Sequence, residues 1–129
     1  MYKRQHIGQQ ARLEGAKLIR KTIDSLAGSN AVILIGDFNS VIQQPPGKEL
    51  VNTTDYKIHL ADTKDRSVEK HYGPSGTFNA FGSKEISDDA IDHIFTTKHF
   101  KVLQHATLSQ SWQGRFSSDH FPVLAVLSM

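Results

Sequence analysis

The sequence predicts an α/β fold with one mixed β-sheet and flanking helices. Three observations support this. One long segment has helical periodicity, several short apolar runs have the length of strands, and turns rich in glycine and proline separate them. The 129 residues are enough for one domain with a modest core.

The first predicted element is a helix over residues 9–27, where apolar side chains recur at spacings of three and four. These side chains are Leu13, Ala16, Ile19, Ile23 and Leu26. Gly28-Ser29-Asn30 ends the helix. The apolar run at residues 31–35 follows at once and predicts a fully buried strand.

The rest of the chain predicts one more helix and three more strands. Pro45-Pro46-Gly47 opens a short helix over residues 48–52. Residues 53–90 are predicted to be rich in loops, because glycine and proline interrupt them. Apolar and β-branched residues predict strands at residues 90–96, 101–108 and 122–127.

The composition excludes several functional classes. A net charge of +2 is too small to argue for nucleic acid or a membrane surface as a partner. The absence of cysteine excludes disulfides, zinc–thiolate sites and thiol catalysis. No apolar stretch approaches the roughly 20 residues of a membrane-spanning helix.

Two polar clusters adjoin predicted strands, where a packed sheet can hold active-site groups. Ile35-Gly36-Asp37-Phe38-Asn39 follows the strand at 31–35. A carboxylate there can orient water or bind a hard cation, and an amide can donate a hydrogen bond to a phosphate oxygen. If the segment is extended, Asp37 and Asn39 share one face. A simple strand-to-turn transition is the alternative, because Asp, Asn and Gly are common in turns.

The second cluster, Ser117-Ser118-Asp119-His120, precedes the last strand. Asp92 and His93 lie in the strand at 90–96 and must point to opposite faces. A lone Asp in an apolar strand needs a partner, and we predict that Asp92 holds His120 in one tautomer. The alternative is an edge strand with Asp92 in water. Asp119 is then free as an oxygen ligand for a hard divalent cation.

Other features are less informative. A serine hydrolase is not favoured, because adjacent residues rarely converge into a triad and the chain has no Gly-x-Ser-x-Gly elbow. Gly76-Thr77-Phe78-Asn79 adds a hydroxyl and an amide, with a plain turn as the alternative. The remaining histidines show no His-x3-His spacing, and we interpret them as surface or loop residues.

The order of the motifs is more specific than any one of them. Gly-Asp-Phe-Asn, Gly-Thr-Phe-Asn, Ile-Asp-His-Ile and Ser-Asp-His-Phe-Pro-Val, in this order, resemble the endonuclease/exonuclease/phosphatase superfamily with its deoxyribonuclease I-like fold. The resemblance runs from about His6 to the C-terminus. It implies half of a four-layer αββα sandwich, and hydrolysis of phosphodiesters or phosphomonoesters with Mg²⁺ or Mn²⁺.

The resemblance also implies roles for individual residues. Asp37 would orient the attacking water or assist the leaving oxygen, and Asn39 would hold the scissile phosphate. Asp119 would belong to the metal site. His120 would contact the phosphate, with Asp92 fixing its ring. The implied substrate-binding residues are Asn39, Asn79 and His120.

Residues 1–129 are therefore predicted to be the C-terminal portion of such a domain, with its N-terminal half absent. That half would carry an early Asn, a metal-binding Glu and a further His, so we expect this fragment to be inactive. The leading prediction is a divalent-metal-dependent phosphoesterase acting on a nucleic acid, a phospholipid head group or a small phosphoester. The alternative is a non-catalytic binding or structural fragment that folds with a partner. In either case, the sheet face that would pack on the missing half should be exposed.

Overall fold

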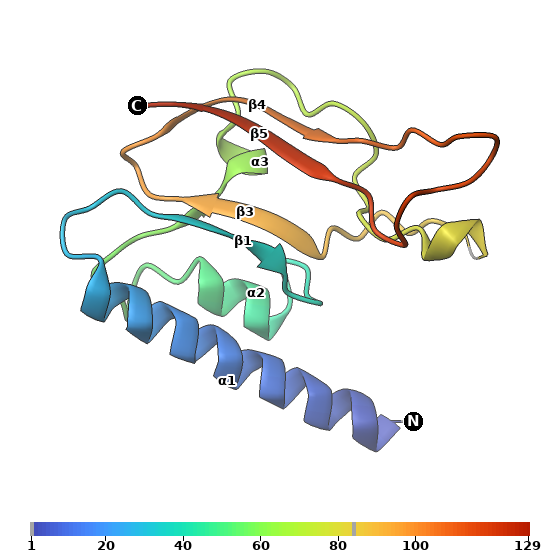
Figure 1. Ribbon diagram of the computed structural model, residues 1–129. Coiled ribbons are helices and arrows are strands. Elements are labelled where there is room, and N and C mark those ends of the chain that lie inside the picture. The colour runs from blue at the N-terminus through green and yellow to red at the C-terminus, as the bar shows by residue number, and fades with distance from the viewer. Residues whose placement is uncertain (1, 84) are drawn as a thin grey trace.

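A long helix and two small antiparallel sheets make up residues 2–83 and 85–129, the part of the chain that this computed structural model describes (Figure 1). The elements are, in order, α1 (Tyr2–Leu26), β1 (Ile33–Asp37), α2 (Pro45–Leu50), β2 (Ala61–Asp62), α3 (Thr63–Arg66), the 3-10 helix η1 (Ala80–Gly82), β3 (Asp92–Thr96), β4 (Lys101–Thr107) and β5 (Val123–Ser128). The predicted α/β class with flanking helices is confirmed.

The strands form two antiparallel sheets where one mixed sheet was expected. The first has the order β1-β3-β2, and the second pairs β4 with β5. The physical reason is that β3 already has a neighbour on each edge, so β4 has no free edge of β3 to join and pairs with β5 instead. Strand β2 lies in the segment predicted to be loop, because a strand of two residues has no detectable periodicity.

The main core lies between α1, α2 and one face of the first sheet. Its fully buried members are Ala16, Leu50, Leu60 and Phe95. Leu34, on the same face of β1, packs against this cluster, and Figure 1 shows both helices on that side of β1 and β3. Ala16, Ile19 and Ile23 of the predicted apolar face meet the sheet, whereas Leu26 at the end of α1 is 77% exposed. Helix α1 also begins earlier than the periodicity indicated.

A buried cation ties α1 to the loop after α2. The Arg20 side chain is fully buried, and its Nη2 donates to the carbonyl oxygens of Asn52 at 3.0 Å and Ile58 at 2.6 Å. Its guanidinium also lies 4.7 Å from the centre of the Tyr56 ring, a cation–π distance. The long loop between α2 and β2 is therefore held against the helix.

The opposite face of the first sheet is apolar and open along β1, where Ile33 and Ile35 are 47% and 65% exposed. In the second sheet, Leu124 and Val126 of β5 are 47% and 42% exposed. Alternating exposure along a strand normally places apolar residues inward and polar residues outward. In β1 the apolar residues Ile33 and Ile35 point outward instead. No helix in the described residues is both long enough and apolar enough to span a bilayer.

We expect Phe95→Ala to lower the free energy of unfolding by about 3–5 kcal/mol, because it empties the centre of the core. Ile35→Ala on the neighbouring strand is the matched control and should change it by less than about 0.5 kcal/mol, since Ile35 is already exposed. Urea unfolding followed by circular dichroism measures both. Equal effects of the two substitutions would contradict the assignment of inner and outer faces.

Candidate active site

Two carboxylates meet where β1 ends and β3 begins. Asp37 is the last residue of β1, Asp92 is the first of β3, and the two are direct partners in the antiparallel register. Directly opposed residues in an antiparallel pair put their side chains on the same face of the sheet. This face is the open one, away from α1 and α2.

His120 lies between these two carboxylates. Its Nδ1 is 2.8 Å from Oδ2 of Asp92, and its Nε2 is 3.7 Å from Oδ2 of Asp37. A carboxylate can only accept, so Nδ1 carries the proton of the Asp92 bond and Nε2 faces Asp37. The predicted pairing of Asp92 with His120 is therefore present, and β3 is not an edge strand.

The charge around His120 favours the imidazolium form. The hydrogen bond from Asp92 raises the pKa of His120 above its ordinary value of 6.5, partial burial opposes this, and the negative charges of Asp92, Asp37 and Asp119 add to it. The ring can thus present Nε2–H as a charged donor toward the open face.

Thr77 brings the His120 segment to β3. Its buried hydroxyl accepts hydrogen bonds from the backbone N–H groups of Ile91 at 3.0 Å and Asp92 at 3.2 Å, and its carbonyl oxygen accepts from Phe121 at 2.7 Å. The preceding Gly76 must be glycine, because a Cβ there would lie 1.8 Å from the carbonyl oxygen of Ser87. The sequence does not predict this role, since a simple turn and a segment that bonds to a distant strand have the same local pattern.

Asn39 lies in a tight turn after β1. Its φ is 48°, and its backbone N–H donates to Oδ1 of Asp37 at 2.9 Å. The extended geometry considered for Asp37 and Asn39 is therefore absent, and the chain turns at Asn39 instead. Asn tolerates this left-handed conformation better than most residues. The turn commits one oxygen of Asp37 and leaves Oδ2 directed at His120.

Asn79 and Asp119 occupy different settings. Asn79 is buried, and its side chain donates to the carbonyl of Ser118 at 3.0 Å and accepts from the N–H of Phe81 at 2.7 Å. It therefore holds the segment that leads to His120. The Asp119 backbone oxygen accepts from Asn79, while its side chain is partly exposed beside His120.

One group of possible metal ligands is present among the described residues. Single ligand atoms of Asp37, Asp92 and His120 all lie within 4.8 Å of one another. Asp119, the predicted metal ligand, is next to His120 in sequence but outside this group. Carboxylate oxygens suit a hard cation such as Mg²⁺, whereas Nδ1 of His120 is already committed to Asp92.

Two of the remaining histidines contradict their interpretation as surface or loop residues. His93 and His105 are each 4% exposed and lie in β3 and β4. Burial lowers the pKa of His105 to about 4, so its ring is neutral. The side chain of His6 lies outside the described residues. Isolated histidines carry no sequence signal that separates buried from exposed ones.

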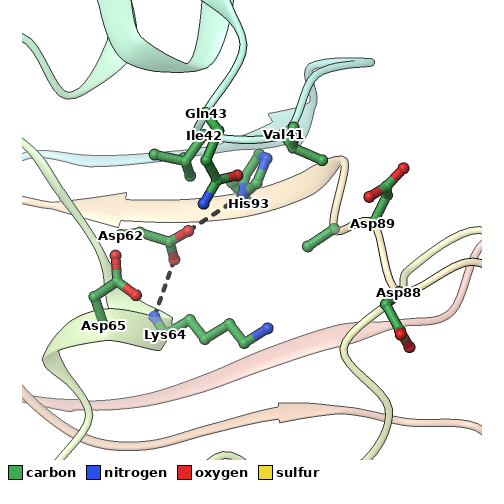
Figure 2. Close-up of a pocket in the computed structure, with 10 residues that line it drawn as sticks. Val41, Ile42, Gln43, Asp62, Lys64, Asp65, Asp88, Asp89 and His93 are labelled. Atoms are coloured by element: carbon green, nitrogen blue, oxygen red, sulfur yellow. Dashed lines mark hydrogen bonds and ion pairs between the residues drawn. The ribbon is translucent and has the colours of Figure 1, made fainter.

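His93 borders a second pocket, away from the open face. This pocket has a volume of about 200 Å³. Its lining residues come from the loop after Asn39, from the region of Asp62 and α3, and from the loop before β3 (Figure 2). Besides His93, it is lined by the acidic residues Asp62, Asp65, Asp88 and Asp89 and by Lys64.

Comparison with known proteins shows what the chain is similar to. The sequence profile described as Endonuclease/Exonuclease/phosphatase family matches residues 10–120. No curated protein matches the chain in sequence. A functionally unknown conserved protein from Enterococcus faecalis is a structural match, with 34% identity and a TM-score of 0.77, over 95% of this chain and 46% of that one.

Two structures from Bacteroides thetaiotaomicron also match. An endonuclease/exonuclease/phosphatase family protein has 30% identity and a TM-score of 0.81, over 95% of this chain and 45% of that one. A mannosyl-6-phosphatase has 31% identity and a TM-score of 0.80, over 96% and 48%. The chain thus spans about half the length of the solved structures it matches.

We expect NMR titration to place the pKa of His120 above 6.5, and Asp92→Asn to lower it, because the substitution removes the charge of the acceptor. A raised native pKa means that the imidazolium stabilises the fold. This contribution is complete below the unfolded pKa of about 6.5 and is lost as the pH rises through the native pKa.

Asp55→Asn is the control, since Asp55 is an exposed carboxylate in the loop after α2. It should leave the titration of His120 unchanged. An Asp92→Asn chain with the parent titration curve would show that Asp92 does not act on the ring.

Proposed function

The chain belongs to the endonuclease/exonuclease/phosphatase family, and on this premise we propose that it is the C-terminal half of a divalent-metal-dependent phosphoesterase domain. The observation that carries the proposal is the cluster of Asp37, Asp92 and His120 on the open face of the sheet. These groups come from three separate parts of the chain, and packing alone does not require them to meet.

The proposed chemistry follows from what each side chain offers. Hydrolysis of a phosphate ester places extra negative charge on the phosphoryl oxygens and needs an oriented water. Oδ2 of Asp37 accepts a hydrogen bond from that water and takes its proton. The Nε2–H of His120 donates to a phosphoryl oxygen, while Asp92 holds the opposite side of the ring. The exposed amide of Asn39 donates to the phosphate.

The residues present fit a hard divalent cation in part. Asp119 has a partly exposed carboxylate beside His120, and Asp37 keeps one oxygen free of backbone hydrogen bonds. A bound Mg²⁺ or Mn²⁺ would act as a Lewis acid toward the phosphate. Mg²⁺ binds weakly to one or two carboxylates alone. The remaining ligands would come from the other half of the domain.

The open apolar face supports the proposal of a missing half. Ile33 and Ile35 of β1 are exposed on that face, and Ile35 lines a shallow pocket together with Asp37 and Asp92. Apolar patches of this kind mark surfaces that pack on something else. The same patch favours the second candidate function, a binding or structural fragment that folds with a partner but does not catalyse.

We propose a small phosphate ester as the substrate class ahead of a nucleic acid or a phospholipid head group. The structural match named as a mannosyl-6-phosphatase supports this choice. The net charge of +2 also gives little attraction for a polyanion. Sugar phosphates, plasmid DNA and phospholipid vesicles offered side by side to the protein with the whole domain would rank the three classes.

In the protein that contains the whole domain, we expect His120→Ala or Asp37→Ala to lower kcat by about 10²–10⁴-fold, because each acts on charge that develops in the transition state. Steady-state hydrolysis of a chromogenic phosphate ester with Mg²⁺ measures this. Ser117→Ala should have no effect, whereas a serine nucleophile would require a loss. Full activity of both His120→Ala and Asp37→Ala would refute the proposal.

The 129-residue chain alone should show little or no hydrolysis with Mg²⁺ or Mn²⁺, because groups that act as a unit lose most of their effect when one is missing. Incubation with plasmid DNA and with a chromogenic phosphodiester tests this. Robust turnover that EDTA removes and His120→Ala abolishes would show that the site is complete without the other half.

A further inference from the structure

His93 directly follows Asp92 in β3, and its side chain points to the opposite face of the sheet. Both ring nitrogens have partners there. Nδ1 lies 3.2 Å from Oδ2 of Asp62, and Nε2 lies 2.7 Å from the carbonyl oxygen of Ser40. Both partners can only accept, so both ring nitrogens carry protons and the ring is an imidazolium paired with the Asp62 carboxylate.

The Asp62 end of this arrangement is rigid. Asp62 lies at the end of β2, and its other carboxylate oxygen accepts the backbone N–H of Lys64 at 2.9 Å, capping α3. Figure 2 shows both contacts at the edge of the second pocket. The Asp62 and His93 side chains are only 7% and 2% exposed. A buried charge pair of this kind is strongly destabilising to break, since the remaining charge has no partner.

At the other end of this arrangement, Ser40 is the last residue of the turn that carries Asn39. Ser40 is buried, and its hydroxyl oxygen accepts the backbone N–H of Gly47 at 3.3 Å. Phe38, also in the turn, packs its ring on His93, with centroids 6.0 Å apart. His93 therefore contacts the turn twice, once through a charged hydrogen bond and once through its ring face.

This turn needs support because its backbone is unfavourable. Asn39 has a positive φ, a conformation that costs energy for any residue other than glycine. Among the residues that the structure describes, one side chain on the open face bonds to this turn: the exposed carboxylate of Asp37 accepts the Asn39 N–H. The charged hydrogen bond from His93 to the carbonyl oxygen of Ser40, on the opposite face, is buried and therefore stronger than the one to Asp37.

We propose that His93, anchored by Asp62, is a positioning residue that holds the Asp37–Asn39 turn against the catalytic face. A purely structural pair would link β2 to β3 alone. The second nitrogen instead reaches the turn that carries two of the proposed catalytic groups. The effect on rate rests on the proposed function, whereas the effect on the turn does not.

The test compares His93→Gln with His105→Gln. His105 is the matched control, because it is a histidine of equal burial in β4 whose ring pairs with His71 rather than with the turn. In the 129-residue chain, the NMR order parameter of the Asn39 amide should fall from about 0.85 to below about 0.6 in His93→Gln. The Phe95 amide, in the middle of β3, should stay near 0.85 in both variants.

In the protein with the whole domain, His93→Gln should lower kcat by about 10- to 100-fold with little change in KM, and His105→Gln should change neither. An Asn39 amide as rigid as in the parent would overturn the proposal. A looser turn with unchanged kcat would also overturn it, provided that Asp37→Ala and His120→Ala do lower the hydrolysis rate of the same protein. If His93→Gln does not fold, Asp62→Asn decides. The Asp62→Asn variant keeps the His93 ring, so it should lower the order parameter of the Asn39 amide by a smaller amount. An unchanged order parameter would overturn the proposal.

Failure of the proposed function has a different outcome. In that case Asp37→Ala and His120→Ala leave hydrolysis unchanged, while the order parameter of Asn39 still responds to His93→Gln. The NMR result and the kinetic result therefore judge the two proposals separately.

Discussion

The antiparallel pairing of β1 with β3 is the constraint on which the site depends. Its register places Asp37 directly opposite Asp92. A slip of one residue would turn one of these side chains to the helix-covered face and separate them. Opposed like charges destabilise a pair of strands by a few tenths of a kcal/mol or more. His120 offsets this repulsion, since it lies within 4 Å of both carboxylates as a partner of opposite charge.

Consecutive residues of β3 serve the two faces of the sheet in different ways. Asp92 faces outward and meets His120, and His93 faces inward and meets Asp62 and Ser40. This is a consequence of the two-residue period of a strand. Because β3 has strands on both edges, it is the most constrained strand of the sheet. A site built on β3 is therefore supported on one face by the contacts of His93. It is also held by the hydrogen bond from the backbone N–H of Asp92 to the Thr77 hydroxyl.

The cluster of Asp37, Asp92 and His120 is well formed within the described residues, beside an exposed apolar surface on β1. The three clustered side chains are positioned by contacts within this half, through the strand register, the turn after β1 and Thr77. In the proposed function, a cation and a substrate need further groups, and Ile33 and Ile35 on the same face are apolar and exposed. Under that proposal, a second half of the domain would complete the preorganised cluster.

The sequence by itself predicted the α/β class, the first helix and the four longer strands, because each rests on local periodicity or apolar runs. It also indicated the pairing of Asp92 with His120, since a carboxylate in an apolar strand requires a partner. The order of the four motifs in the chain indicated the resemblance to a known family. All of these inferences need only the identity and spacing of residues.

Tertiary structure alone decided the rest. Strand β2 forms only because β3 offers an edge, and that same occupied edge separates β4 and β5 into a second sheet. His93 and His105 are buried because of what packs around them, which no local pattern records. Asn79 and Thr77 sit in a stretch that reads as a turn, yet their partners are far away in sequence. Long-range hydrogen bonds between segments, invisible to local pattern, determine what these residues do.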